Sequence, residues 1–385
     1  MKKGKIAHFF EEKDILTISV GLFIISRLMM FAMYVLLFKD FSFVNFLDKM
    51  NRFDSNHYAR IALEGYSPVP DNSIGEAGWA FFPLYPMLVG LTVKLTSLRY
   101  ETVAFIYGAL MCIASAVVAG KYIRLTGGSE REAKIYAFLL IMGPQSFFLS
   151  IFYTEPAFLL LLTLCFYFLQ KKQYIPMGIC GALLSATRNL GVFFVFAVLA
   201  AWLTDLFRER KKDPGYTFSK HLKAALNDPS LVLGVFLIPS GLFSYMYFLY
   251  NRVGDAMAFV RVQKAWGRIN GFFVKTYINA LKDLTGYAAY HAVWVTLAFF
   301  LILFMIFKYK RFHEAVIALI ILLMPMMSTM DSMARFILGG FVFYRTGAAI
   351  LDSREGFFRR AVLVFLAGYA LVMLNGWFYG EGVLT

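Results

Sequence analysis

The chain contains several apolar runs, each about as long as the hydrocarbon core of a bilayer is thick. The clearest runs lie at residues 15–38, 100–124 and 361–377. A membrane-spanning helix needs about 20 consecutive, mostly apolar residues. The composition agrees, because 59% of the 385 residues are hydrophobic and only 16% are charged. A soluble fold of this length could not bury so many apolar side chains, so the sequence predicts an all-α polytopic membrane protein.

We expect about eleven membrane-spanning helices. Six further apolar runs lie at 135–151, 156–169, 231–250, 292–307, 315–327 and 336–351. The stretch 174–207 is too long for one helix, and Arg188 and Asn189 interrupt it near its middle. Because a charge at mid-membrane costs about 2.5–3.5 kcal/mol, we interpret this stretch as two short helices joined by an outer turn.

The distribution of basic residues predicts the orientation. With the N-terminus in the cytoplasm and the C-terminus outside, 23 of the 38 lysines and arginines lie in cytoplasmic segments, beginning with Lys2, Lys3, Lys5 and Lys13. The outer segments are longer but carry only 14, as the positive-inside rule requires. Lysines and arginines in the cytoplasmic loops of a membrane protein therefore account for the net charge of +14. We expect no nucleic-acid partner, because the basic residues are scattered between apolar spans.

The chain is predicted to form a single membrane-embedded domain over residues 1–385, with large outer loops at 39–99 and 251–291. The first run is too long for a signal-peptide core and no small-residue cleavage site follows it, so we expect it to be retained. Residues 83–97 are expected to form a helix in the outer interface, because an additional span there would turn the basic cluster at 208–212 outward. The three cysteines lie inside apolar runs and have no metal-ligand spacing.

The first outer loop contains the most informative residues. It includes RFDSNHYARIALEGY and, further on, AFFPLYP. If residues 57–64 form a helix, Asp54 and Ser55 would cap its N-terminus. Alternatively, partial desolvation of the Asp54 carboxylate at the membrane edge would make it a usable general base. The two roles are compatible, and the residues alone leave both open.

These segments resemble the first luminal loop of the PIG-V type mannosyltransferases, which belong to the GT-C superfamily of polytopic glycosyltransferases. Later segments resemble family segments in the same order, namely FYTEPAF, ATRNLG, VQKAWGRINGFF and SMARFILGGFVFY. One departure is visible, because Phe53 stands where the family pattern has a tryptophan. The resemblance covers most of the chain and is most specific in the first outer loop.

The resemblance implies that the chain transfers a sugar, typically mannose, from a polyprenyl-phosphate donor to an acceptor hydroxyl. The reaction inverts the anomeric configuration and takes place on the non-cytoplasmic face. The aspartate of the first loop is the presumed general base in the family, which assigns that role to Asp54. The family relation also implies a GT-C-like arrangement with a large helical first outer loop.

The leaving group of such a reaction is a lipid phosphate, which needs fixed positive charge near the outer interface. Candidates for binding the donor phosphate are Arg188, Arg335, Lys264 and Arg268. Candidates for contacting the sugar or the acceptor are His57, Tyr58, Glu155, Asn189, Gln263 and Trp266. Each also has an ordinary structural interpretation, such as snorkelling of a basic side chain or anchoring of an aromatic ring at the headgroups.

No metal or cofactor is expected, because the acidic residues of the first loop do not form a D-x-D or D-E pair. The expected partners are the lipid-linked donor, membrane lipids and an acceptor lipid or glycan that the sequence does not identify. The compact loops favour a prokaryotic plasma membrane with the site facing outward. A lipid or lipid-linked-sugar transporter and a non-catalytic accessory subunit remain alternatives, although no repeat typical of transporters is visible.

Overall fold

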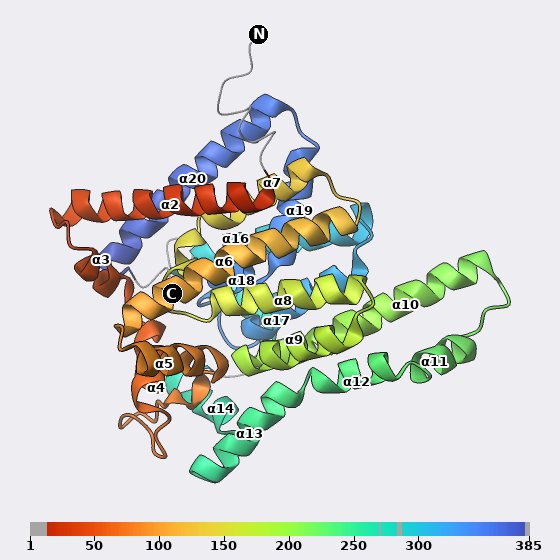
Figure 1. Cartoon of the computed structure of the whole chain (residues 1–385), viewed down its shortest axis with the longest axis horizontal. Coiled ribbons are helices and arrows are strands. Elements are labelled where there is room, and N and C mark those ends of the chain that lie inside the picture. The colour runs from red at the N-terminus through yellow and green to blue at the C-terminus, as the bar shows by residue number, and fades with distance from the viewer. Residues whose placement is uncertain (1–13, 269–270, 283–286, 382–385) are drawn as a thin grey trace. The chain divides into compact units, whose positions relative to one another are not determined.

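The computed structural model describes residues 14–268, 271–282 and 287–381, and the regular structure in these residues is entirely helical (Figure 1). The all-α prediction is thus confirmed. The four lysines that precede the first predicted span, at positions 2, 3, 5 and 13, lie outside the described residues.

The chain folds as two compact units, which are described separately. The first consists of Met1–Gly65, Tyr85–Thr163 and Ala334–Thr385, and the second of Tyr66–Leu84 and Leu164–Met333. The helices of the first unit are α2 (Ile15–Phe38), α3 (Phe43–Met50), α4 (Asp54–Glu64), α5 (Leu84–Thr96), α6 (Tyr100–Leu125), α7 (Glu130–Met142), the start of α8 (Glu155–Gln170), α18 (Met333–Gly339), α19 (Phe341–Asp352) and α20 (Gly356–Tyr379).

Helix α7 forms the centre of the first unit, where it packs against α2, α6, α19 and α20. It begins earlier and ends earlier than the predicted span at 135–151. Gly143 and Pro144 end the helix, because proline disfavours the helical conformation of the residue before it. A short 3-10 turn, η2 (Ser146–Leu149), and an irregular segment then lead to α8.

Arg27 on α2 holds this turn in place. Its guanidinium donates hydrogen bonds to the Ser150 hydroxyl (2.5 Å) and to the Ser146 carbonyl (3.2 Å). The side chain is buried and also stacks over Phe23. The deepest charge of the sequence therefore faces the helix bundle and fixes the segment that leads to α8.

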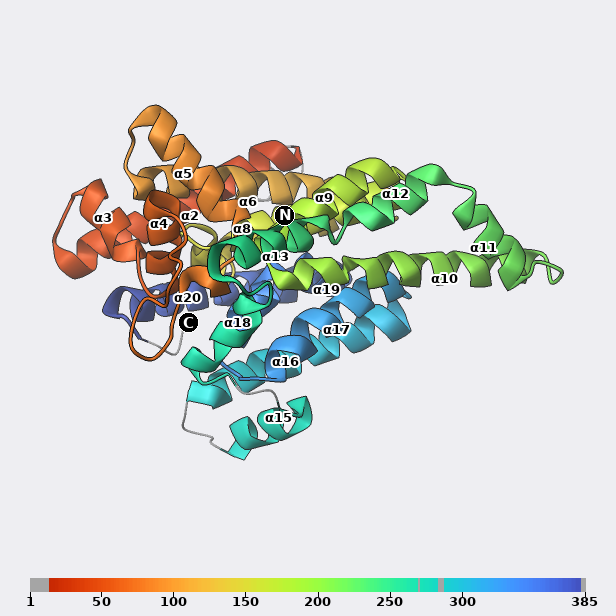
Figure 2. The same cartoon turned by 90° about the horizontal axis from the view of Figure 1, so that it is seen from below.

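The second unit contains α9 (Tyr174–Thr187), α10 (Phe194–Lys212), α11 (Phe218–Leu226), α12 (Pro229–Leu237), α13 (Ser240–Val253), α14 (Ala258–Arg261), α15 (Phe273–Lys282), α16 (Tyr287–Leu303) and α17 (Phe312–Met326). Helix α9 packs against α12 and α13, and α10 packs against α17. Helix α11 joins the ends of α10 and α12 (Figure 2). A Cβ on Gly178 would lie 2.4 Å from the Gly234 carbonyl oxygen, so only glycine allows α9 and α12 to approach so closely.

Among the residues that the structure describes, six helices are long and apolar enough to cross a membrane, and a seventh candidate is the pair α18 and α19, which is bent by 79°. Their surfaces carry large exposed apolar side chains, such as Leu28 on α2 and Phe365 on α20. Such side chains are expected where a helix faces lipid, and the chain is thus an integral membrane protein. Four shorter apolar helices, α5, α8, α9 and α17, coincide with further predicted segments.

The predicted break at Arg188 is present, because Arg188 ends α9 with an extended backbone and a 3-10 turn, η3 (Asn189–Phe193), follows. The predicted run at 336–351 is also broken, at Gly339 and Gly340. Glycine is costly within a helix, and two in succession account for the bend. The count of eleven spans and their orientation stay predictions.

Candidate functional site

Asp54 lies at the first position of α4, directly after a residue with unusual backbone geometry. Phe53 has φ +53° and ψ −123°, a region that costs a non-glycine residue roughly 1–3 kcal/mol. No side chain caps this helix start. The interpretation of Asp54 as a helix cap is therefore wrong, because its carboxylate is turned to another partner. Helix α4 also begins three residues earlier than the predicted start at 57.

That partner is Arg335 on α18. Its Nη1 lies 2.7 Å from Oδ2 of Asp54, and its Nε lies 3.4 Å from Oε1 of Glu155 at the start of α8. The Arg335 side chain is 6% exposed and that of Glu155 is fully buried, whereas 34% of the Asp54 side chain is exposed. We call Asp54, Glu155 and Arg335 the carboxylate–arginine cluster. Its Asp54 end is the part that solvent reaches.

The sequence thus singled out three residues that the first unit brings together from α4, α8 and α18. A buried arginine between two carboxylates has its charge compensated. Its planar guanidinium can hold both carboxylates in fixed directions. The arrangement therefore orients the Asp54 carboxylate without burying it.

Tyr153 was not selected from the sequence, although it lies in the FYTEP motif. Its hydroxyl accepts a hydrogen bond from the Asp54 backbone N–H (3.1 Å) and donates one to the Arg52 carbonyl (3.3 Å). The Arg335 guanidinium stacks over its ring at 4.9 Å. Burial and, second, the Asp54 carboxylate raise the pKa of Tyr153 well above its ordinary value. The residue remains a neutral phenol that ties the strained Arg52–Asp54 segment to the bundle.

The two aromatic candidates beside Asp54 lie differently. Tyr58 is buried; its hydroxyl lies 3.4 Å from the Thr154 hydroxyl, and its ring packs edge-on against Tyr85. His57 is partly exposed, and its Nδ1 lies 3.4 Å from a guanidinium nitrogen of Arg60. Tyr58 is therefore part of the packing behind Asp54.

The remaining candidates belong to the second unit. Arg188 and Asn189 lie at the junction of α9 and η3. Gln263, Lys264 and Trp266 lie in a 3-10 turn, η4 (Val262–Trp266).

Arg268 follows that turn and donates a hydrogen bond from Nη1 to the Gln263 side-chain oxygen (2.9 Å). The Trp266 ring packs edge-on against Phe81. Gln263 and Arg268 thus form one polar group beside Trp266.

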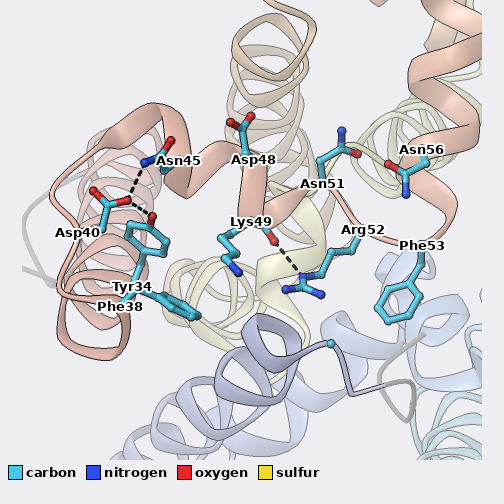
Figure 3. Close-up of a pocket in the computed structure, with 11 residues that line it drawn as sticks. Tyr34, Phe38, Asp40, Asn45, Asp48, Lys49, Asn51, Arg52, Phe53 and Asn56 are labelled. Carbon is cyan, nitrogen blue, oxygen red and sulfur yellow. Dashed lines mark hydrogen bonds between the residues drawn. The ribbon is translucent and has the colours of Figure 1, made fainter.

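The first unit also contains a cavity of about 770 Å³ between the end of α2, α3, the start of α4 and the end of α20 (Figure 3). Phe53 and Asn56, on either side of Asp54, belong to its lining, together with Tyr34, Phe38, Asp40, Asn45, Asp48, Lys49, Asn51, Arg52 and Gly380. None of the residues selected from the sequence lines it. The sequence signal for this cavity is the density of charged and carboxamide side chains at 40–56.

Among residues 14–268, 271–282 and 287–381, no three histidine, cysteine, aspartate or glutamate side chains are grouped so that they could hold a metal ion. Within the carboxylate–arginine cluster, the guanidinium occupies the space between the two carboxylates. The carboxylate oxygens of the cluster already bind the Arg335 guanidinium, whose positive charge would repel a metal cation.

No protein-family model matches the chain, and no curated protein matches its sequence. Among solved structures, ArnT from Cupriavidus metallidurans, crystallised with bound undecaprenyl phosphate, aligns over 95% of this chain and 74% of its own, with a TM-score of 0.56 and 14% identity. The oligosaccharyltransferase of Archaeoglobus fulgidus, tethered to an acceptor peptide, aligns over 87% of this chain and 51% of its own, with a TM-score of 0.45 and 13% identity. The likeness to ArnT shows a shared fold.

Proposed function

We propose that the chain is a membrane glycosyltransferase that takes a sugar from a polyprenyl-phosphate donor. The observation that carries this proposal is the partly exposed Asp54 carboxylate, held by the buried Arg335. The shared fold with ArnT, which was crystallised with undecaprenyl phosphate, supports a lipid-phosphate substrate. A charged cluster of this kind in a membrane protein is a functional hypothesis by default.

In the proposed reaction, Asp54 accepts the proton of the acceptor hydroxyl. The hydroxyl oxygen attacks the anomeric carbon of the donor sugar and forms the new glycosidic bond. The bond from that carbon to the phosphate oxygen breaks, and its electron pair leaves with polyprenyl phosphate. Attack opposite the leaving group inverts the anomeric configuration. Arg335, Glu155 and Tyr153 act as positioning residues for Asp54.

The departing phosphate needs compensating positive charge. We assign this role to Arg188, Lys264 and Arg268, with Gln263, Asn189 and Trp266 beside them as sugar contacts. Arg335 is a further candidate, but two carboxylates already share its charge. It would contact the phosphate only by giving up part of that pairing, so positioning Asp54 is its first role.

The finer assignment follows the resemblance to the PIG-V type family of the GT-C superfamily. Mannose is the sugar we propose, His57 is a further sugar contact, and the acceptor is a lipid or glycan. The chain would cross the plasma membrane of a prokaryote eleven times, with Asp54 on the outer face. The basic segments at 121–134 and 208–223 would then lie in the cytoplasm.

A transporter of lipid-linked sugars is the second candidate, because discontinuous helices are typical of transporters. The pair α18 and α19 is bent by 79°, and Arg335 lies on the first of the two. A transporter would move the donor across the membrane without breaking its sugar–phosphate bond.

The deciding experiment incubates the purified protein with labelled polyprenyl-phosphate mannose and extracted membrane lipids. A transferase releases polyprenyl phosphate and produces a labelled lipid or glycan. Recovery of intact donor, together with its movement across vesicles that contain the protein, would instead identify the transporter.

A further inference from the structure

We propose that the cavity between α2, α3, α4 and the end of α20 binds a neutral saccharide, the headgroup of the acceptor. This inference rests on the proposed function and names the class of its second substrate. The cavity has a volume of about 770 Å³, within the usual range of about 300–1,000 Å³ for small-molecule pockets. No residue of the proposed catalytic or phosphate-binding groups lines it.

The lining has the hydrogen-bonding character that sugar hydroxyls require. A hydroxyl both donates and accepts hydrogen bonds. Three carboxamides, from Asn45, Asn51 and Asn56, offer donors and acceptors together. The charged side chains of the lining are two carboxylates, Asp40 and Asp48, and two cationic groups, Lys49 and Arg52, so their formal charges cancel. A polar wall without net charge suits a neutral polyhydroxylated ligand better than an anion.

Asp40 keeps a negative charge at this wall. Its carboxylate accepts hydrogen bonds from the Tyr34 hydroxyl (2.5 Å), the Asn45 amide group (2.8 Å) and the Ser42 backbone N–H (2.8 Å). The hydrogen bond from Tyr34, followed by those from Ser42 and Asn45, holds the pKa of Asp40 below its ordinary value. The carboxylate is therefore charged at neutral pH and repels a phosphate group.

The two cationic groups are already held in position. The Lys49 ammonium lies over the Phe38 ring at 4.8 Å. Arg52 donates to the carbonyls of Lys49 (3.3 Å) and Phe378 (3.0 Å), which links α3 to the end of α20. In Figure 3, both side chains point to the same side as the Phe53 ring, towards the end of α20. They can serve as directed donors to ligand oxygens without further ordering.

An exposed aromatic ring provides the other element of a sugar site. Phe53 is 37% exposed and packs edge-on against the buried Trp377. Its positive φ directs the ring into the cavity, whereas the next residue, Asp54, turns to Arg335. Aromatic rings offer a large apolar face with a fixed direction, and the C–H face of a sugar ring can pack on it.

The position of the cavity fits an acceptor. Phe53 and Asn56 belong to its lining and flank the proposed base in the chain. A saccharide held there lies against Phe53 at the start of α4, next in the chain to Asp54, whose side chain is 34% exposed. The strained backbone at Phe53 then serves the proposed function. It lets the Phe53 ring face the ligand while the side chain of Asp54 faces Arg335.

The test measures binding of linear mannotriose to the full-length protein in lipid nanodiscs by saturation-transfer NMR and calorimetry. We expect saturable binding, weakened at least tenfold in the double variant Asn45→Leu and Asn56→Leu. Phe53→Ala should weaken it by a similar factor. The matched control is Asn251→Leu, which removes an exposed carboxamide of the second unit and should bind like the unaltered protein.

Three results would overturn the saccharide site. The first is that mannotriose binds nowhere on the folded protein, and the second is that it binds equally well to the cavity variants. The third is that inorganic phosphate binds in the cavity instead and is lost in Lys49→Gln. Thermal unfolding checks that each variant is folded. Asn56→Gln keeps a carboxamide in the cavity and should bind mannotriose more tightly than the double leucine variant.

Failure of this inference and failure of the proposed function are distinguishable. If the protein consumes polyprenyl-phosphate mannose but the cavity variants bind mannotriose normally, the saccharide site is wrong and the transferase stands. If mannotriose binds in the cavity but no lipid-linked donor is consumed, the cavity is a saccharide site. The proposed function is then wrong, and the cavity is not the acceptor site of a transferase.

Discussion

At the scale of single residues, Arg335 decides how Asp54 works. The guanidinium lies between an exposed and a buried carboxylate, and removing it would leave a buried charge uncompensated, at a cost of about 3–5 kcal/mol. Arg335→Met is therefore expected to unfold the protein at a markedly lower temperature. A variant that keeps the charge is needed to examine its role in turnover.

Arg335→Lys retains the positive charge but cannot span both carboxylates, because an ammonium lacks the planar fork of a guanidinium. We expect kcat to fall at least tenfold while the KM for the lipid-linked donor changes less than twofold. Steady-state kinetics over a range of donor concentrations measures both. A large rise in donor KM with kcat preserved would mean that Arg335 binds the donor phosphate and does not position Asp54.

Tyr153 is the second positioning residue. Tyr153→Phe removes the hydroxyl that accepts a hydrogen bond from the Asp54 backbone N–H and donates one to the Arg52 carbonyl. A hydrogen bond contributes about 0.5–1.5 kcal/mol to stability, so we expect a modest loss of stability and a several-fold fall in kcat. Tyr167→Phe on α8, whose ring lies against Lys171, is the control, and an equal effect there would refute the positioning role.

The residues of the candidate site could be predicted only in part from the sequence. Asp54, Glu155 and Arg335 were each selected from their own segment, but local spacing cannot show that α4, α8 and α18 bring them into contact. The helix-cap interpretation of Asp54 failed for the same reason, since a distant arginine takes up the carboxylate. Tyr153 was missed because an aromatic residue in an apolar segment is usually part of the core.

At the scale of helices, α4 is positioned by close packing against α5. A Cβ at Gly90 would lie 2.2 Å from the Ala62 carbonyl oxygen, and a backbone carbonyl cannot move aside as a side chain can. Gly90→Ala should therefore displace α4 and destabilise the protein by roughly 1–3 kcal/mol, with reduced turnover.

The matched control is Gly21→Ala on α2, where the added Cβ meets nothing within 4 Å. Alanine is favoured over glycine within a helix by up to about 1 kcal/mol, so this variant should be at least as stable as the unaltered protein. Thermal unfolding and transferase assays compare the two. Equal stability of both variants would show that the α4–α5 contact is not tight.

The helices themselves were predicted better than their ends. Hydropathy located the long apolar helices because each covers the thickness of a bilayer. The predicted span at 135–151 was too long, since a hydropathy pattern does not register the break at Gly143 and Pro144. Arg188 was predicted to interrupt its segment and does, because a charged side chain is costly in the middle of a membrane-spanning helix.

At the scale of the whole molecule, we propose a membrane enzyme whose charge compensation comes from arginine and lysine. In the carboxylate–arginine cluster, a guanidinium stands where a divalent cation would have to bind. We expect that prolonged treatment with EDTA leaves the transferase activity unchanged. Loss of activity that added Mg²⁺ or Mn²⁺ restores would show that a metal takes part.

The proposed mechanism depends above all on removal of the acceptor hydroxyl proton by the Asp54 carboxylate. The decisive experiment determines kcat of Asp54→Asn with labelled polyprenyl-phosphate mannose, alongside donor binding and thermal unfolding of the same preparation. Because general-base catalysis contributes about 10²- to 10⁴-fold, we expect a folded protein that binds donor and has lost turnover by such a factor. Near-normal turnover in this variant would show that Asp54 is not the base.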